Sequence, residues 1–80
     1  MDYHYVFAGE FANGDKFKGI WSGISTDVPD LSDQQKTSAL EQFTYQCSSA
    51  YVIIKKIDGE IITIFPDKIR MARVVGVLPV

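Results

Sequence analysis

The stretch that decides the fold is Tyr51-Val52-Ile53-Ile54-Lys55-Lys56-Ile57-Asp58-Gly59-Glu60-Ile61-Ile62-Thr63-Ile64-Phe65. Two runs rich in β-branched residues flank Asp58-Gly59, and these two residue types tolerate the positive φ that a tight chain reversal needs. The pattern predicts a β-hairpin. A two-residue loop would set Ile57 opposite Glu60, whereas a three-residue loop with Gly59 as a bulge sets Lys56 opposite Glu60. We prefer the three-residue loop because it gathers the aliphatic side chains on one face of the hairpin.

The same register sorts the side chains of this hairpin onto two different faces. One face is predicted to be wholly aliphatic and dry, and the other to be partly wet. The dry face holds Val52, Ile54, Ile62 and Ile64, and the wetter face holds Tyr51, Ile53, Lys55, Ile61, Thr63 and Phe65.

A second hairpin is predicted around Asn13-Gly14, between residues 3 and 24. Asn-Gly is a strong hairpin signal, and a three-residue loop with Gly14 as the bulge sets Glu10 opposite Lys16. This register sets aromatic residues opposite glycines, so we expect rings to cover the glycines of the neighbouring strand. If this register continued to the end of the hairpin, Tyr3 would pair with Gly23.

A helix is predicted after the polar connection that ends at Pro29. Ser32 and Gln35 have the spacing of a capping box, with Asp30 as a competing N-cap. An apolar stripe at helical spacing supplies one face that can pack on a sheet. The stripe consists of Ala39, Leu40, Phe43 and Cys47.

Lys68 to Leu78 is predicted to be a last strand, with a short helix from Asp67 to Val75 as the rival. We favour the strand because valines prefer extended backbone. Strict alternation would place Ile69, Met71, Val75 and Val77 on one side and Arg70, Ala72, Val74 and Leu78 on the other. The whole chain, residues 1–80, is then one α+β domain. We expect a bent antiparallel sheet of about five strands (ββαβββ) with one helix packed on one face.

Two turns resemble the signature of the Sm-like family. Asn13-Gly14-Asp15-Lys16-Phe17-Lys18-Gly19 resembles its first half, and Ile57-Asp58-Gly59-Glu60 resembles the Ile-Arg-Gly turn of its second half. The family's leading helix is missing, an insertion separates the two halves, and Asp58 stands at the arginine position that RNA binding would use. The alternative fold is accordingly a small SH3-like or Sm-like β-barrel with a helical insertion. Both segments are also ordinary hairpin turns, and we assign no family from them.

Composition points to a globular cytoplasmic protein. The chain is 46% hydrophobic and 22% charged, with a net charge of -2 and one cysteine. A single cysteine excludes an intramolecular disulfide, and a reducing compartment fits it. The first residues lack a signal-peptide pattern, and the longest apolar run, Val74 to Val80, is too short to cross a membrane.

The motifs point away from an enzyme and away from any cofactor or metal. His4 is the only histidine and Cys47 the only cysteine. We expect His4 on the surface of an edge strand and Cys47 in the core. Asp27, Asp30 and Asp33 are better explained by helix capping than by cation binding. The leading hypothesis is therefore a small non-enzymatic protein-binding module, an adaptor or inhibitor, whose size and class suggest a phage or mobile-element origin.

The alternative function is nucleic-acid binding through a basic face of the C-terminal strands. Residues 51–80 carry a local charge of +2 against -4 in residues 1–50. Neighbouring strands would bring the basic residues together beside Tyr51 and Phe65, where phosphates and bases could be held. The candidate contacts are Lys55, Lys56, Lys68, Arg70 and Arg73.

A homodimer is predicted from the surplus of apolar surface over what one helix can cover. The last strand is expected at the edge of the sheet, where an apolar strand is a template for pairing with a second chain. The dimer would form by such edge pairing or by packing of sheet faces across a two-fold axis. The candidate interface residues are Val74, Val75, Val77 and Leu78.

Overall fold

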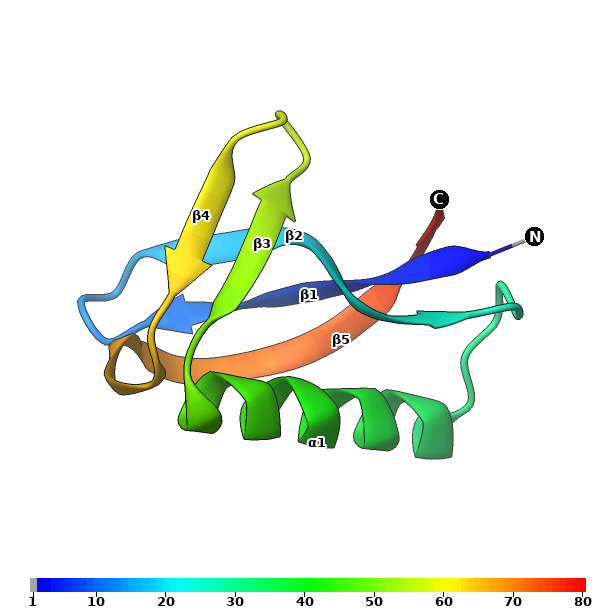
Figure 1. Cartoon of the computed structure of the whole chain (residues 1–80), viewed down its shortest axis with the longest axis horizontal. Coiled ribbons are helices and arrows are strands. Elements are labelled where there is room, and N and C mark those ends of the chain that lie inside the picture. Colours follow the sequence, from blue (N-terminus) through cyan, green and yellow to red (C-terminus); the bar gives the residue numbers. More distant parts are fainter. Residues whose placement is uncertain (1) are drawn as a thin grey trace.

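The chain forms one five-stranded antiparallel sheet with a single α-helix on one face (Figure 1). The computed structural model describes residues 2–80. The predicted ββαβββ order is confirmed, and the strand order across the sheet is β4-β3-β2-β1-β5. The sheet is open, with β4 and β5 as its edges, so the alternative of a closed barrel is wrong. The elements are β1 (Tyr3–Phe11), β2 (Lys16–Thr26), α1 (Asp33–Ser49), β3 (Val52–Lys56), β4 (Ile61–Ile64), a 3₁₀ turn (Pro66–Lys68) and β5 (Ile69–Pro79).

Both hairpins turn as predicted, with the glycine as the bulge residue. Gly14 and Gly59 have φ of 95° and 94°, in the left-handed region that glycine adopts without a steric cost. The Lys56 amide donates to the Glu60 carbonyl at 2.7 Å, which confirms the predicted pairing. A carboxylate oxygen of Asp58 also accepts a hydrogen bond from the Glu60 amide at 2.9 Å and supports the turn.

The far end of the first hairpin departs from the predicted register. Tyr5 pairs with Trp21 as expected, but the next pair is His4 with Ser25, so Tyr3 faces Thr26 and not Gly23. The ring over Gly23 belongs to Trp21 of the same strand. Aromatic covering of glycine from the neighbouring strand does not occur there, although the Phe17 ring does lie against Gly9.

The last strand is confirmed, but strict alternation along it is wrong. Register shifts interrupt the pairing of β5 with β1 between Val6 and Phe7 and between Glu10 and Phe11. Each shift adds a residue on one strand and reverses the side that the following side chains face. As a result Met71 and Val75 are exposed. The β5 residues that pack against the core are Ile69, Ala72, Val74 and Val77.

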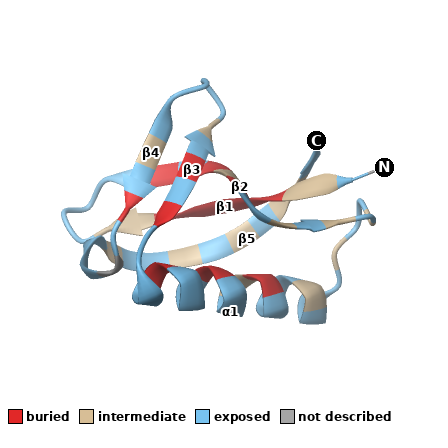
Figure 2. Cartoon of the chain, in the orientation of Figure 1, coloured by how far each residue is buried: buried red, intermediate tan, exposed pale blue. Residues whose placement is uncertain are grey.

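The core lies between α1 and the sheet, as the band of buried residues in Figure 2 shows. The predicted capping box begins the helix. The backbone amide of Gln35 donates to the Ser32 hydroxyl, and the backbone amide of Ser32 donates to the side-chain carbonyl of Gln35. Phe43 of α1 stacks on Phe7 with ring centroids 4.4 Å apart, and it meets Trp21 edge-on at 5.5 Å. These aromatic contacts fix α1 against β1 and β2.

Candidate binding groove

The sheet opens between its two central hairpins. Strands β2 and β3 form only two paired positions, Gly19 with Lys56 and Ile20 with Lys55. Continuing this register would next pair Trp21 with Ile54 and then Ser22 with Ile53, yet neither pair forms within residues 2–80. In Figure 1, β2 runs on past β3 towards the start of α1, and the strands separate. This separation leaves unpaired strand edges facing an opening in the sheet.

The same part of β2 also lacks partners on its other side. The β1–β2 register steps from Tyr5–Trp21 directly to His4–Ser25, so Ser22, Gly23 and Ile24 stand opposite no residue of β1. Ser22 and Gly23 are exposed and Ile24 is half-buried. Within the described chain, these three residues therefore have no ladder partner in either neighbouring strand. Backbone amides and carbonyls in such a segment are ready to pair with another strand.

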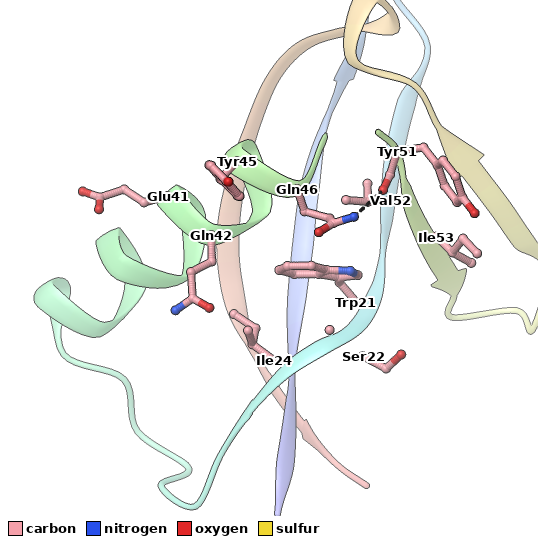
Figure 3. A pocket seen from close by; sticks show the side chains of 11 residues that line it. Trp21, Ser22, Ile24, Glu41, Gln42, Tyr45, Gln46, Tyr51, Val52 and Ile53 are labelled. Atoms are coloured by element: carbon pink, nitrogen blue, oxygen red, sulfur yellow. Dashed lines mark hydrogen bonds between the residues drawn. The ribbon is translucent and has the colours of Figure 1, made fainter. Parts of the chain in front are cut away.

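Two contacts border the opening. The Trp21 indole folds back over Gly23, where a Cβ atom would overlap the ring. On the other side, the Gln46 side-chain amide donates to the Tyr51 carbonyl at 3.4 Å, which ties the approach to β3 to the helix (Figure 3).

The opening forms a groove with a volume of about 780 Å³, within the range of ligand-binding clefts. We call it the β2–β3 groove. Its lining mixes apolar groups with the side-chain amides of Gln42 and Gln46. Among the described residues, Glu41 is the one charged residue that lines it. Figure 3 shows that α1, β2 and β3 all contribute to it. The other lining residues are Trp21, Ser22, Gly23, Ile24, Tyr45, Tyr51, Val52 and Ile53.

A second hollow extends the groove along β2. It has a volume of about 520 Å³ and shares Gly23, Ile24 and Gln42 with the first. Its helix side is lined by residues of the first turns of α1, among them Gln35. The two hollows together follow β2 past its unpaired segment, which is the direction that an extended peptide would take.

Apolar side chains crowd the outer face of the β3–β4 hairpin, the face turned away from α1. Tyr51, Ile53, Ile61 and Phe65 are each between 46% and 66% exposed, and the rings of Tyr51 and Phe65 lie 6.1 Å apart. The predicted division of this hairpin into a dry and a wetter face therefore holds. The wetter face is markedly apolar for a surface in contact with water.

The five predicted basic contacts do not form one cluster. Strands β2 and β1 lie between β3, which carries Lys55 and Lys56, and β5, which carries Arg70 and Arg73. Three of the five pair with carboxylates: Lys56 with Asp58 and Glu60, Lys68 with Asp67, and Arg70 with Glu10. Lys55 and Arg73 form no ion pair within the described residues.

The four predicted interface residues lie on the sheet edge, as expected for β5. Their side chains divide between two surroundings. Val74 and Val77 pack against the core, whereas Val75 and Leu78 are 39% and 38% exposed. Only Val75 and Leu78 present side chains that a second chain could cover.

His4 and Cys47 do not meet in a common site. Cys47 belongs to the core, where burial raises the pKa of its thiol. His4 is half-buried in β1, between β2 and β5, so its expected place on an edge strand is wrong. Among residues 2–80 there is no group of three or more His, Cys, Asp or Glu side chains arranged to hold a metal ion.

Sequence reasoning missed the groove because its signals lie in tertiary structure. Its lining residues come from β2, α1 and the start of β3, which are separated in the sequence. The predicted set of basic residues, all in the C-terminal strands, also omits Lys18, which lies in β2 beside β3.

Comparisons with protein-family models, with curated proteins and with solved structures give no match to this chain. No helix within residues 2–80 is both long enough and apolar enough to cross a membrane.

Proposed function

We propose that this chain is a small non-enzymatic protein-binding module, an adaptor or inhibitor, that holds an extended segment of a partner protein in the β2–β3 groove. The observation that carries the proposal is the unpaired segment Ser22–Ile24, which stands beside a groove of peptide size. In strand addition, main-chain hydrogen bonds supply affinity and alternate side chains supply specificity.

The groove offers a suitable chemistry for a peptide main chain. The β2–β3 register would continue with Trp21–Ile54 and then Ser22–Ile53, so a partner strand laid in the groove could pair with the unpaired edge of β2. The Gln42 side-chain amide forms no hydrogen bond within the described residues and can both donate to and accept from a peptide. An apolar side chain of the partner would rest beside Ile24 and the edge of the Trp21 ring. These features favour a largely uncharged, extended ligand.

Selection from a displayed library of random peptides tests the proposal and requires no named partner. We expect the selected peptides to lose binding when alternate backbone nitrogens are methylated and to keep it when the intervening nitrogens are methylated. This alternation is the signature of main-chain pairing, since only every second amide of a strand faces its neighbour. Equal tolerance of methylation at every position would reject strand addition.

A pair of proline variants locates the site. Ser22→Pro removes an amide in the unpaired segment and should abolish peptide binding. Thr63→Pro is the matched control, because Thr63 is an exposed residue of the edge strand β4, where proline is tolerated. Circular dichroism checks that both variants fold. Loss of binding in the control alone would place the peptide on the β3–β4 hairpin and contradict the proposal.

We also propose that two copies pair through the free edge of β5. This edge strand is 11 residues long and exposes Val75 and Leu78, and an edge of that length is a template for antiparallel pairing. A two-fold axis would make each copy contribute the same strand.

A further inference from the structure

The outer face of the sheet carries a second surface, which differs from the groove in its chemistry and shares Tyr51 with it. Ala8 of β1 pairs with Lys18 of β2 on one side and with Arg73 of β5 on the other. The neighbours of Lys18 in sequence, Phe17 and Gly19, are buried, as are Phe7 and Gly9 beside Ala8. The two cations therefore project from the face opposite α1, on either side of one small side chain.

A hollow of about 390 Å³ lies at this place. Ala8, Lys18 and Arg73 all line it, together with Lys16. Glu10 lines it as well, but Arg70 donates to the Glu10 carboxylate at 3.3 Å and offsets its charge. Lys16, Lys18 and Arg73 form no ion pair within residues 2–80. The hollow is thus bordered by cations that have no carboxylate partner.

The unpaired cations continue across the sheet. Lys55 pairs with Ile20, two residues along β2 from Lys18, so it is the diagonal neighbour of Lys18 on the outer face. Diagonal neighbours in a sheet lie about 7–8 Å apart, and residues two strands apart lie about 10 Å apart. We call Arg73, Lys18 and Lys55 the basic row. Their flexible side chains can reach successive negative groups along such a path.

Four of the ten acidic residues lie in α1 or in the connection that leads to it. Asp27 and Asp30 lie in the connection between β2 and α1, and Asp33 and Glu41 lie in α1 itself. The basic row faces away from these four carboxylates, because it lies on the face of the sheet opposite α1. Such segregation lets an acidic protein attract an anion to one face.

Aromatic rings end the basic row on the same face. Tyr51, just before β3, lies on the same outer side as Ile53 and Lys55 of that strand. In extended backbone, Tyr51 is then about 13 Å from Lys55. The Tyr51 and Phe65 side chains are 46% and 50% exposed. A cationic path beside exposed aromatic rings is the arrangement that holds the phosphates of a single strand and stacks its bases.

We propose that the basic row and the Tyr51–Phe65 pair bind single-stranded nucleic acid. Phosphate groups contact Arg73, Lys18 and Lys55, and a base stacks on the exposed aromatic pair. Arginine and lysine are the usual phosphate contacts, and stacking on aromatic rings tolerates any base, so binding shows little sequence preference.

Fluorescence anisotropy with labelled oligo(dT) and oligo(rU) of about 20 nucleotides tests the proposal. Three phosphate contacts predict a slope of about -2 in a plot of log K against log salt concentration, since each contact on a single strand contributes about -0.7. Affinity should then fall on the order of 50–100-fold between about 25 mM and about 200 mM salt. Absence of binding at the lower salt concentration overturns the proposal.

Charge-removing variants identify the surface. Arg73→Gln and Lys18→Gln should each weaken binding and each reduce the slope by about 0.7. Phe65→Ala should weaken binding while leaving the slope unchanged, because stacking releases no counterions. Lys36→Gln is the matched control, since Lys36 is an exposed lysine of α1 without an ion pair among the described residues. An equal loss of binding in Lys36→Gln, or competition by polyglutamate as effective as that by oligonucleotide, would refute a phosphate-binding row.

Discussion

Replacing Gly23 by alanine should disturb the Trp21 indole, which forms part of the proposed groove. A Cβ atom at position 23 would overlap the indole Cε2 and Cζ2 atoms and would lie 2.8 Å from Nε1, whereas ordinary contact begins at 3.4 Å. The ring must therefore move by roughly half an ångström or more. It has little freedom to do so, because Trp21 is 8% exposed and meets Phe7 and Phe43 edge-on, at 5.8 and 5.5 Å.

The expected cost of Gly23→Ala is about 1–3 kcal/mol, the range for overpacking a well-filled site. A domain of 80 residues has a total stability of about 4–12 kcal/mol, so this loss is substantial. At about 4–8 °C per kcal/mol, a cost of about 2 kcal/mol lowers Tm by roughly 8–16 °C. Alanine also restricts the unfolded chain, which offsets the loss by about 0.4–1 kcal/mol at most.

Urea unfolding followed by tryptophan fluorescence measures both the stability and the environment of the indole, because Trp21 is the only tryptophan. We expect a lower free energy of unfolding and a red-shifted native emission. Gly76→Ala is the matched control: it also lies in a strand, but no atom lies within 4 Å of the added methyl group, so its stability should stay within about 0.5 kcal/mol of the wild type or rise slightly. Wild-type stability and emission in Gly23→Ala would refute the packing described for Trp21.

Three further features have testable consequences: the packing of Gly19, the burial of Cys47 and the free edge of β5. Gly19→Ala should lower the free energy of unfolding by about 3 kcal/mol or more, as measured by thermal unfolding. The added Cβ would lie 2.6 Å from the Lys55 carbonyl oxygen and would break one of the two paired positions that join β2 to β3. A variant as stable as the wild type would show that this pairing is not needed. Burial raises the pKa of the Cys47 thiol above its ordinary 9.0, so the stability that the thiol contributes is present below that pH and is lost as pH rises through the folded-state pKa. The free energy of unfolding should therefore fall between about pH 7 and about pH 10, and by less in Cys47→Ala; an equal fall in both proteins would contradict the assignment. Analytical ultracentrifugation should find a dimer for the wild type and a monomer for Val75→Lys. A wild-type protein that is monomeric at all micromolar concentrations would reject the dimer. A Val75→Lys variant that is still dimeric would reject β5 as the dimer interface.

The sequence predicts the local elements well because their determinants are local. Asn13-Gly14 and Asp58-Gly59 specify their turns through residues that tolerate positive φ, and Ser32 with Gln35 specifies the helix start through hydrogen bonds three residues apart. Each of these signals acts within a few residues, so neighbouring strands and the helix hardly alter it.

The sheet order and the bulges depend on contacts between distant segments. The pairing of β1 with β2 skips Ser22–Ile24, where the Trp21 ring covers Gly23. The two shifts along β5 decide that Val74, and not Val75, reaches the core. Lys18 and Arg73 can be placed in one basic row only when β1 is known to lie between β2 and β5. For this reason the sequence identified the apolar face of the β3–β4 hairpin but neither the groove nor the full basic row.

Amide hydrogen exchange at Ser22, Gly23 and Ile24, with and without a peptide selected for binding, is the most direct test of the groove. These amides should exchange rapidly in the free protein, in contrast to the paired amides of β1, because they have no ladder partner in either neighbouring strand. A bound peptide that adds a strand should slow exchange in this segment and leave the free edge of β5 unchanged. Slow exchange of all three amides in the free protein, or unchanged exchange in the complex, would contradict binding by strand addition at this groove.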